Sequence, residues 1–294
     1  MKASDNRNSA NREETMIRRQ LLAAAFAAAS LFCFASLNAR ADDTDVPAAG
    51  VSKRIDDIKS RGVLKVAVIG EFPWLKENTS GAGEPFEGPA WFLANEYAKR
   101  LGVKLETVAV SHETKVPILA TGQVDISIAP LSVTDARKKV VDFVVYSKST
   151  ICFFGKADNP KLAKVDKVDD LNNPDITIAY FTGTPPETYL PTRLPKATIK
   201  GVQGSGANAP TDEIMSGRAD LAPIDTVAWA DLNKKIPGLI VFPKGDECLT
   251  HGEMPTDVGM AVDKNQPEFL NWLTAVYNQV KDQASAEELK VLKE

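Results

Sequence analysis

Two charged residues of opposite sign are the strongest candidates for chemistry in this chain. Arg137 stands at a predicted helix start, where a guanidinium can hold a carboxylate with two parallel hydrogen bonds. Asp225 ends a short apolar strand, and its carboxylate can accept a hydrogen bond from an ammonium group. Both have simpler explanations, because Arg137 begins the basic run Arg-Lys-Lys and Asp225 can cap the helix that follows. Together they match the two ends of a zwitterion, so we interpret them as anchors for a small zwitterionic or carboxylate ligand.

Three hydroxyl residues extend this candidate ligand site. Ser132 and Thr134 come shortly before Arg137, and each can donate to the same carboxylate or cap the helix instead. Thr184 begins the sequence Thr-Pro-Pro-Glu, which is typical of a capping box at a helix start. A helix N-terminus suits an anion because its N–H groups are free, but the two prolines after Thr184 have no N–H to offer.

Aromatic residues and one acid are candidates for the walls of the same site. Phe72, Trp74 and Trp91 can enclose a ligand side chain, since aromatic faces stabilise both apolar and cationic groups. Each of the three can equally belong to the core. Glu71 precedes Phe72, and a pocket that contains Glu71 beside aromatic rings would tolerate a cationic side chain.

The elements that must position these residues follow a plan that occurs twice. Gly122 and Gly217 each end a predicted helix, and each precedes an acid and a short apolar strand with polar residues at its far end. Strands of this kind alternate with helices after residue 62, which is typical of mainly parallel sheets covered by helices. We therefore predict two α/β lobes whose strand ends face one cleft, where open parallel sheets bind ligands. We also predict a long amphipathic helix over 266–283 near the C-terminus.

Residues 1–41 have the pattern of a secretory signal peptide. Arg18 and Arg19 precede an apolar run over 21–37, and Ala39 and Ala41 have the spacing of a cleavage site. The apolar run is short for a membrane anchor. The arginine pair is compatible with either the general secretory or the twin-arginine export route. We expect the mature protein to be exported to the periplasm without an anchor.

Charge and histidine content narrow the classes of partner. The chain has 35 basic and 39 acidic residues and a net charge of −4, so we expect no nucleic acid partner. His112 and His251 are the only histidines, and no cluster of metal ligands surrounds them in the sequence. We therefore expect neither a metal nor another cofactor.

The cysteines leave two possibilities. Cys33 would be removed with the signal peptide, so the mature chain would retain Cys152 and Cys248 in an oxidising compartment. We favour a disulfide between them, near the point where the chain passes between the predicted lobes. Two buried free thiols are the alternative, because cysteine is often a buried residue.

Several short motifs occur in a fixed order along the chain: Phe72-Pro-Trp74, Gly88, Leu101-Gly-Val-Lys-Leu-Glu106, Ser132-Val-Thr134-Asp-Ala-Arg137, Val141-Asp-Phe143, Gly183-Thr184, Gly217-Arg-Ala-Asp220 and Asp225. In this order they resemble the family 3 solute-binding proteins of polar amino-acid ABC transporters. The resemblance implies the type II periplasmic-binding fold, in which two crossover strands join two lobes. It places lobe 1 at 62–153 and 254–294, and lobe 2 at 154–253. It also implies a monomer that delivers its ligand to a membrane permease.

The chain departs from the pattern of these relatives at three places, and the first is the pair Pro185 and Pro186, which supply no N–H. Pro130 stands where they usually carry a small hydroxyl residue, and Gly88 is followed by Pro and Ala rather than by the usual acid. An amino acid remains the leading ligand, and its identity is left open.

An enzyme is the main alternative to a binding protein. Cyclohexadienyl dehydratases, which act on arogenate or prephenate, also resemble the chain, including the two cysteines. They carry a glutamate three residues after the aspartate that matches Asp225, and the residue here is Ala228. Because their elimination chemistry needs a general acid in the cleft, we expect this protein not to be an enzyme. A periplasmic partner of a sensor or of a dehydrogenase is a third possibility.

Overall fold

One mixed sheet runs through the residues that the computed structural model describes, which are 46–204 and 209–293. Its strands lie in the order β4 (Lys104–Ala109), β1 (Val63–Val68), β5 (Ile126–Ser132), β11 (Glu253–Asp263), β6 (Val141–Lys156), β9 (Leu221–Asp225), β7 (Thr177–Phe181) and β8 (Thr198–Val202), and β10 (Leu239–Phe242) pairs with β6. A separate hairpin consists of β2 (Lys76–Glu77) and β3 (Phe86–Glu87). The predicted signal peptide at 1–41 and Cys33 lie outside the described residues.

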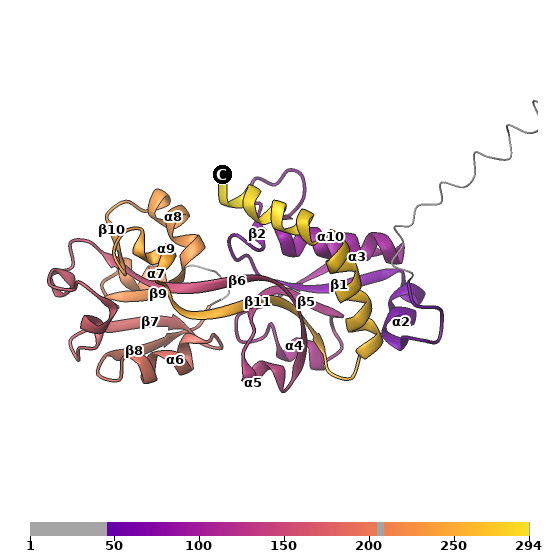
Figure 1. Ribbon diagram of the computed structural model, residues 1–294, viewed down its shortest axis with the longest axis horizontal. Helices are drawn as coiled ribbons and strands as arrows, with labels where there is room; N and C mark the ends of the chain where they lie inside the picture. The colour runs from indigo at the N-terminus through magenta and orange to yellow at the C-terminus, as the bar shows by residue number, and fades with distance from the viewer. Residues whose placement is uncertain (1–45, 205–208, 294) are drawn as a thin grey trace, which may run out of the picture. The chain divides into compact units, whose positions relative to one another are not determined.

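Two long strands join two parallel regions of this sheet. On one side, β1 pairs in parallel with β4 and with β5, and on the other side β7 pairs in parallel with β8 and with β9. Strands β6 and β11 are antiparallel to each other and extend through both regions (Figure 1). This arrangement confirms the predicted α/β fold with two crossover strands. We keep the names lobe 1 and lobe 2 for the residue ranges predicted above.

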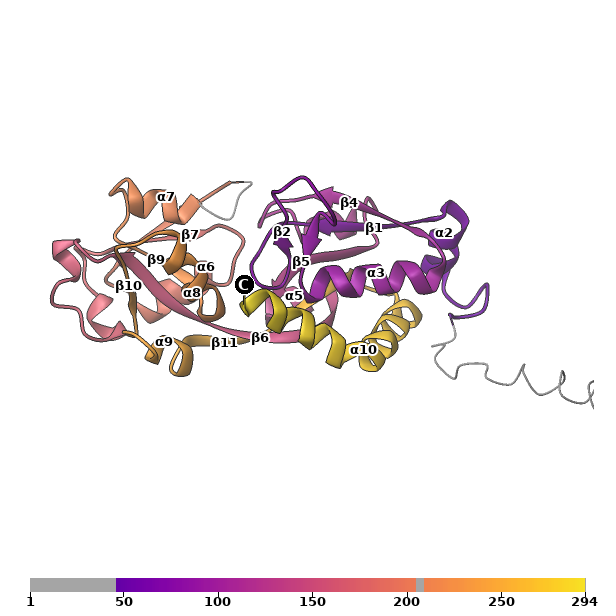
Figure 2. The same ribbon diagram turned by 90° about the horizontal axis from the view of Figure 1, so that it is seen from above.

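Lobe 1 is covered by helices α3 (Pro89–Leu101) and α10 (Pro267–Lys293), which lie side by side (Figure 2). The Tyr97 hydroxyl of α3 donates to the carbonyl of Leu273 at 3.2 Å, and its ring packs on that of Trp272. Helix α10 is about one-half longer than predicted, because the buried residues continue to Val291 beyond the expected end. The shorter helices here are α2 (Lys53–Arg61), α4 (Pro117–Ala120) and α5 (Asp135–Lys138).

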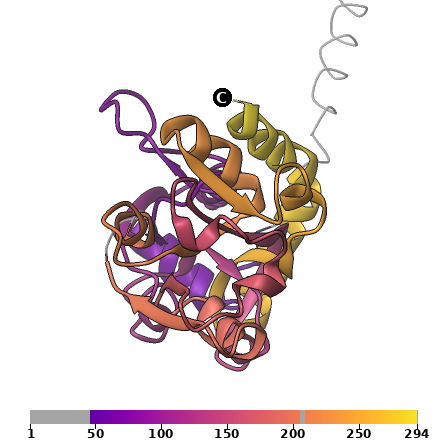
Figure 3. The same ribbon diagram turned by 90° about the vertical axis from the view of Figure 1, so that its left-hand side faces the viewer.

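Lobe 2, which faces the viewer in Figure 3, has its own apolar core. Phe153, Ile178, Leu221 and Phe242 are fully buried in this core. Its helices are α6 (Pro186–Arg193), α7 (Ala209–Met215), α8 (Thr226–Lys235) and α9 (Glu247–Thr250), with 3-10 turns at η1 (Pro160–Leu162) and η2 (Val168–Leu171). Among the described residues, none of the helices is both long and apolar enough to cross a bilayer.

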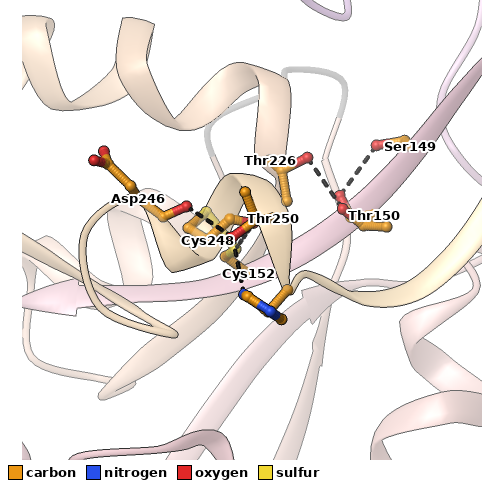
Figure 4. Close-up of a disulfide and its surroundings, with 8 residues drawn as sticks. Ser149, Thr150, Cys152, Thr226, Asp246, Cys248 and Thr250 are labelled. Atoms are coloured by element: carbon orange, nitrogen blue, oxygen red, sulfur yellow. Dashed lines mark hydrogen bonds between the residues drawn. A yellow bond between two sulfur atoms is a disulfide. The ribbon is translucent and has the colours of Figure 1, made fainter.

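A disulfide joins Cys152 of β6 to Cys248 of α9, as the sequence led us to expect (Figure 4). The two Cα atoms are 5.7 Å apart, and both side chains are fully buried. Close to it, the hydroxyls of Thr150 and Thr226 form a hydrogen bond of 3.2 Å. The disulfide therefore ties the first crossover strand to the helix that precedes the second.

Candidate functional site

A cavity of about 240 Å³ lies between residues of the two lobes. Strands β5, β7 and β9 all end at it, so that Ser132, Phe181 and Asp225 line its wall. This is the carboxyl edge of the parallel strands, where the fold leaves space beyond the last backbone hydrogen bonds. Six of the nine residues that we expected at a ligand site line this cavity: Glu71, Phe72, Ser132, Arg137, Thr184 and Asp225.

Arg137 spans the cavity between the lobes. Helix α5 positions it, and Nη1 donates to the carbonyl of Ser132 at 2.8 Å within lobe 1. Nη2 donates to the carbonyl of Gly183 in lobe 2 at 2.9 Å. Thr134 is the cap of this helix, since its hydroxyl accepts a hydrogen bond from the Arg137 N–H at 3.2 Å. Thr134 does not line the cavity, so of its two predicted roles the capping role is the one observed.

Asp225 lines the same cavity from lobe 2. Its Oδ1 accepts a hydrogen bond of 2.6 Å from the Ser149 hydroxyl on the crossover strand. It precedes α8 but makes no side-chain capping bond to that helix. Burial, and then the negative charge of Glu71, raises the pKa of Asp225 to about 7, although Ser149 and Lys115 act in the opposite direction. Beyond the Ser149 bond, the carboxyl group can accept further hydrogen bonds from a ligand, and its ionisation depends on the charges that lie in the cavity.

A buried lysine that sequence analysis missed completes the charged set. The Lys115 side chain is only 3% exposed, yet it lines the cavity. Its Nζ donates to the carbonyl of Pro130 at 2.6 Å and to Oε2 of Glu71 at 3.2 Å. Burial lowers the pKa of Lys115, and the charge of Glu71 opposes that change. The sequence held no specific signal for this role, because a lysine before a short helix is normally solvated.

Two of the three expected aromatic wall residues lie elsewhere. Trp74 is 1% exposed and donates from Nε1 to the Ser147 hydroxyl at 3.0 Å. Trp91 is 8% exposed, packs on Phe86, and donates to Glu84 at 3.1 Å. Both belong to the lobe 1 core, because each finds a buried apolar setting and a partner for its indole N–H there. The aromatic residues that do line the cavity are Phe72, His112, Phe154, Tyr180 and Phe181.

The lobes contact each other directly beside the cavity. The rings of His112 and Phe181 are 4.3 Å apart, and the Thr182 hydroxyl donates to Glu113. Burial, and then the charge of Lys115, lowers the pKa of His112 to about 4, so its ring is neutral at pH 7. Gly183, with φ of 76°, fits closely against this contact, since an added Cβ would lie 3.0 Å from Cα of Glu113. These contacts hold the loop after β7 close to lobe 1, so that the Arg137 guanidinium reaches the carbonyl of Gly183.

Thr184 lines the cavity, but it does not form the predicted capping box. Its hydroxyl donates back to the carbonyl of Phe181, and the residue that caps α6 is Pro185, which makes no side-chain capping bond. The Glu187 carboxylate does reach back along the chain, but it accepts from the N–H of Gly183 at 2.8 Å rather than from that of Thr184. Across the described residues, no group of three histidine, cysteine or acidic side chains could hold a metal ion.

Comparisons with known proteins place these features in context. The sequence profile described as bacterial extracellular solute-binding proteins, family 3, matches residues 64–291. The chain is 24% identical over 210 residues to a cyclohexadienyl dehydratase of Pseudomonas aeruginosa, covering 69% of this chain and 71% of that protein. It is 27% identical over 186 residues to the L-cystine-binding protein TcyJ of Escherichia coli, covering 62% and 65%.

A solved structure agrees with these sequence matches. The ancestral amino acid-binding protein AncCDT-1, described as a precursor of cyclohexadienyl dehydratase, superposes with a TM-score of 0.67 and 30% identity. The match covers 81% of this chain and 97% of that one. Both the binding proteins and the dehydratase are thus similar to this chain.

Proposed function

Because the chain belongs to family 3 of the bacterial extracellular solute-binding proteins, we propose that it binds a small amino acid or related carboxylate between two lobes that close on it. In this proposal the protein is a periplasmic monomer of an ABC transporter and delivers the ligand to a membrane permease. Its relatives include a protein named for binding L-cystine.

The observation that carries the proposal is that Arg137 and Asp225 line one cavity from opposite lobes. Arg137 has five N–H donors and uses two of its nitrogens on carbonyl groups, so donors remain for a carboxylate. Asp225 accepts a hydrogen bond from the Ser149 hydroxyl and can accept further hydrogen bonds from an ammonium group. A zwitterion between them would bridge the lobes and favour the closed arrangement.

Further groups support this assignment of roles. Ser132 and Thr184 line the same cavity. The Ser132 hydroxyl can donate to a ligand carboxylate, whereas the Thr184 hydroxyl already donates to the carbonyl of Phe181. Phe72 and the other aromatic rings supply walls for an apolar portion of the ligand, and the cavity of about 240 Å³ suits a ligand smaller than a typical drug molecule.

A thermal-shift screen of amino acids and 2-oxo acids, followed by calorimetric titration, tests the proposal. A ligand that binds only the folded protein raises its melting temperature, and saturation at 100 times the dissociation constant stabilises it by about 2.7 kcal/mol. We expect at least one small carboxylate to do so. If none raises the melting temperature or produces binding heat, the proposed function is wrong.

The dehydratase relative gives the alternative of an enzyme a specific basis. We propose a binding protein rather than an enzyme, because Ala228 lines the cavity at the position where the sequence resemblance places the dehydratases' acid. Loss of a positioned general acid lowers rate on the order of 10²–10⁴-fold. Incubation with prephenate and arogenate should yield no phenylpyruvate or phenylalanine above the uncatalysed rate, and clear turnover would favour the enzyme.

A further inference from the structure

Glu71 and Lys115 form an ion pair inside the candidate ligand cavity. Both side chains line the cavity, with exposed fractions of 23% for Glu71 and 3% for Lys115. The Lys115 ammonium group is held at 3.2 Å from Glu71 and at 2.6 Å from the carbonyl of Pro130. These two contacts fix the ammonium group from two sides, at the end of β5 and at the loop after β1. Removing either charge would leave the other largely buried and unpaired.

Besides the Glu71–Lys115 pair, the cavity contains one basic and one acidic side chain that are not paired with each other. After the Glu71–Lys115 pair is set aside, Arg137 remains as a cation, and Asp225, whose pKa is raised to about 7, remains as an acid that the ammonium group of a ligand would favour in its ionised form. The third acid of the lining, Asp231, already pairs with Lys235 at 2.8 Å. His112 is the remaining titratable base, and burial keeps it neutral at pH 7. A ligand with one carboxylate and one ammonium group therefore balances the cavity, and a second positive charge on the ligand finds no unpaired acid there.

We propose that Lys115 is a built-in cation that occupies Glu71 and so excludes solutes with a positively charged side chain, which makes it a specificity-determining residue. This inference rests on the proposed function and narrows its ligand to a carboxylate with an uncharged side chain. A guanidinium or ammonium group near Glu71 would meet the Lys115 charge in a largely desolvated cavity, and such like-charge contacts are strongly unfavourable. The apolar wall formed by Phe72, Phe154 and Ile151 suits an uncharged side chain instead.

The decisive experiment removes the cation and leaves the acid. Lys115→Met keeps the length and apolar stem of the side chain, so Glu71 loses its partner and becomes available to a cationic solute. L-arginine and L-lysine are titrated into the wild-type protein and into the variant, with L-glutamine and L-methionine as uncharged probes. We expect the wild type to bind the cationic amino acids at least about 100-fold more weakly than its best uncharged ligand. We expect Lys115→Met to gain at least about 10-fold in affinity for L-arginine.

Two further variants test whether a change in affinity comes from the loss of the Lys115 charge rather than from misfolding or from an effect that does not involve Glu71. Lys115→Gln keeps a donor for the Pro130 carbonyl and should show the same gain if Lys115→Met fails to fold, as judged by circular dichroism. In Lys115→Met with Glu71→Gln, the acid is also removed, and the gain for L-arginine should disappear.

The outcomes separate this inference from the proposed function. Failure of both folded Lys115 variants to gain affinity for L-arginine overturns the role of Lys115, whatever the wild type binds. Wild-type affinity for L-arginine within 10-fold of the best uncharged ligand also overturns it. If no uncharged carboxylate binds the wild type but L-arginine binds the variants, the proposed ligand is wrong and the exclusion by Lys115 stands.

Discussion

Nη2 of Arg137 in lobe 1 donates a 2.9 Å hydrogen bond to the carbonyl of Gly183 in lobe 2. The same guanidinium also holds the carbonyl of Ser132 in its own lobe. One side chain therefore contacts both lobes and lines the cavity between them. A ligand carboxylate bound by Arg137 would contact a guanidinium that already links the two lobes. Ligand binding and lobe closure would therefore depend on the same residue.

Substitution of Arg137 by alanine should weaken ligand binding by at least about 100-fold. Loss of one partner from a desolvated charge pair typically costs several kcal/mol, and each 1.4 kcal/mol is about tenfold in affinity. Calorimetric titration measures the change. Lys139→Ala is the matched control, because Lys139 belongs to the same basic run but is exposed and does not line the cavity. Equal affinities in the two variants would rule out Arg137 as an anchor.

Substitution of Gly183 by alanine should impair closure of the lobes. Its φ of 76° is unfavourable for alanine, and the new Cβ would lie 3.0 Å from Cα of Glu113 and 3.1 Å from the carbonyl oxygen of His112. Gly217→Ala is the control, since Gly217 has a φ of 73° and no atom within 4 Å of an added Cβ. We expect Gly183→Ala to bind ligand about 10-fold more weakly than Gly217→Ala. Similar affinities would mean that the contact with lobe 1 is dispensable.

The carboxyl group of Asp225 should make stability depend on pH in a defined direction. Its pKa is raised from 3.8 to about 7, so between these values the folded protein keeps a proton that the unfolded chain releases. The resulting stabilisation is complete below pH 3.8 and is lost as pH rises through 7. Asparagine does not titrate, so the stability of Asp225→Asn relative to wild type should increase with pH over this range. The increase is at most about 1.4 kcal/mol per pH unit.

Urea unfolding of the ligand-free proteins from pH 4 to pH 8 measures this difference. Other groups that face the cavity, including Glu71, Lys115 and His112, are present in both proteins and largely cancel in the comparison. A stability difference that is constant with pH would show that Asp225 titrates at its ordinary value.

The disulfide should contribute substantially to stability. Cys152 and Cys248 are 96 positions apart, and a crosslink that closes so long a loop restricts the unfolded chain. We expect the double variant Cys152→Ser and Cys248→Ser to lose about 2–4 kcal/mol of unfolding free energy. Denaturant unfolding with and without reductant provides the check. Reductant should destabilise the wild type and leave the variant unchanged, and an insensitive wild type would contradict the prediction.

Local sequence determined the architecture and the principal candidate anchors. Alternating apolar strands and helices, with glycines at helix ends, predicted the α/β lobes, and the resemblance to the family 3 solute-binding proteins implied the two crossover strands. Arg137 and Asp225 could be proposed because each stands at the end of an element whose type was readable from its neighbours. Their ligand roles stay predictions, while the placement of both residues at one cavity follows from the edge at which parallel strands end.

The tertiary structure alone decided which of several equivalent residues face the ligand cavity. The sequence could not distinguish the core residues Trp74 and Trp91 from pocket-wall residues, because a core and an apolar pocket wall both favour aromatic rings. Lys115 had no local signal, since its partners Glu71 and Pro130 lie 44 and 15 positions away in the sequence. The free energy of a buried charge depends on groups brought near it by folding, and spacing along a chain does not report those distances.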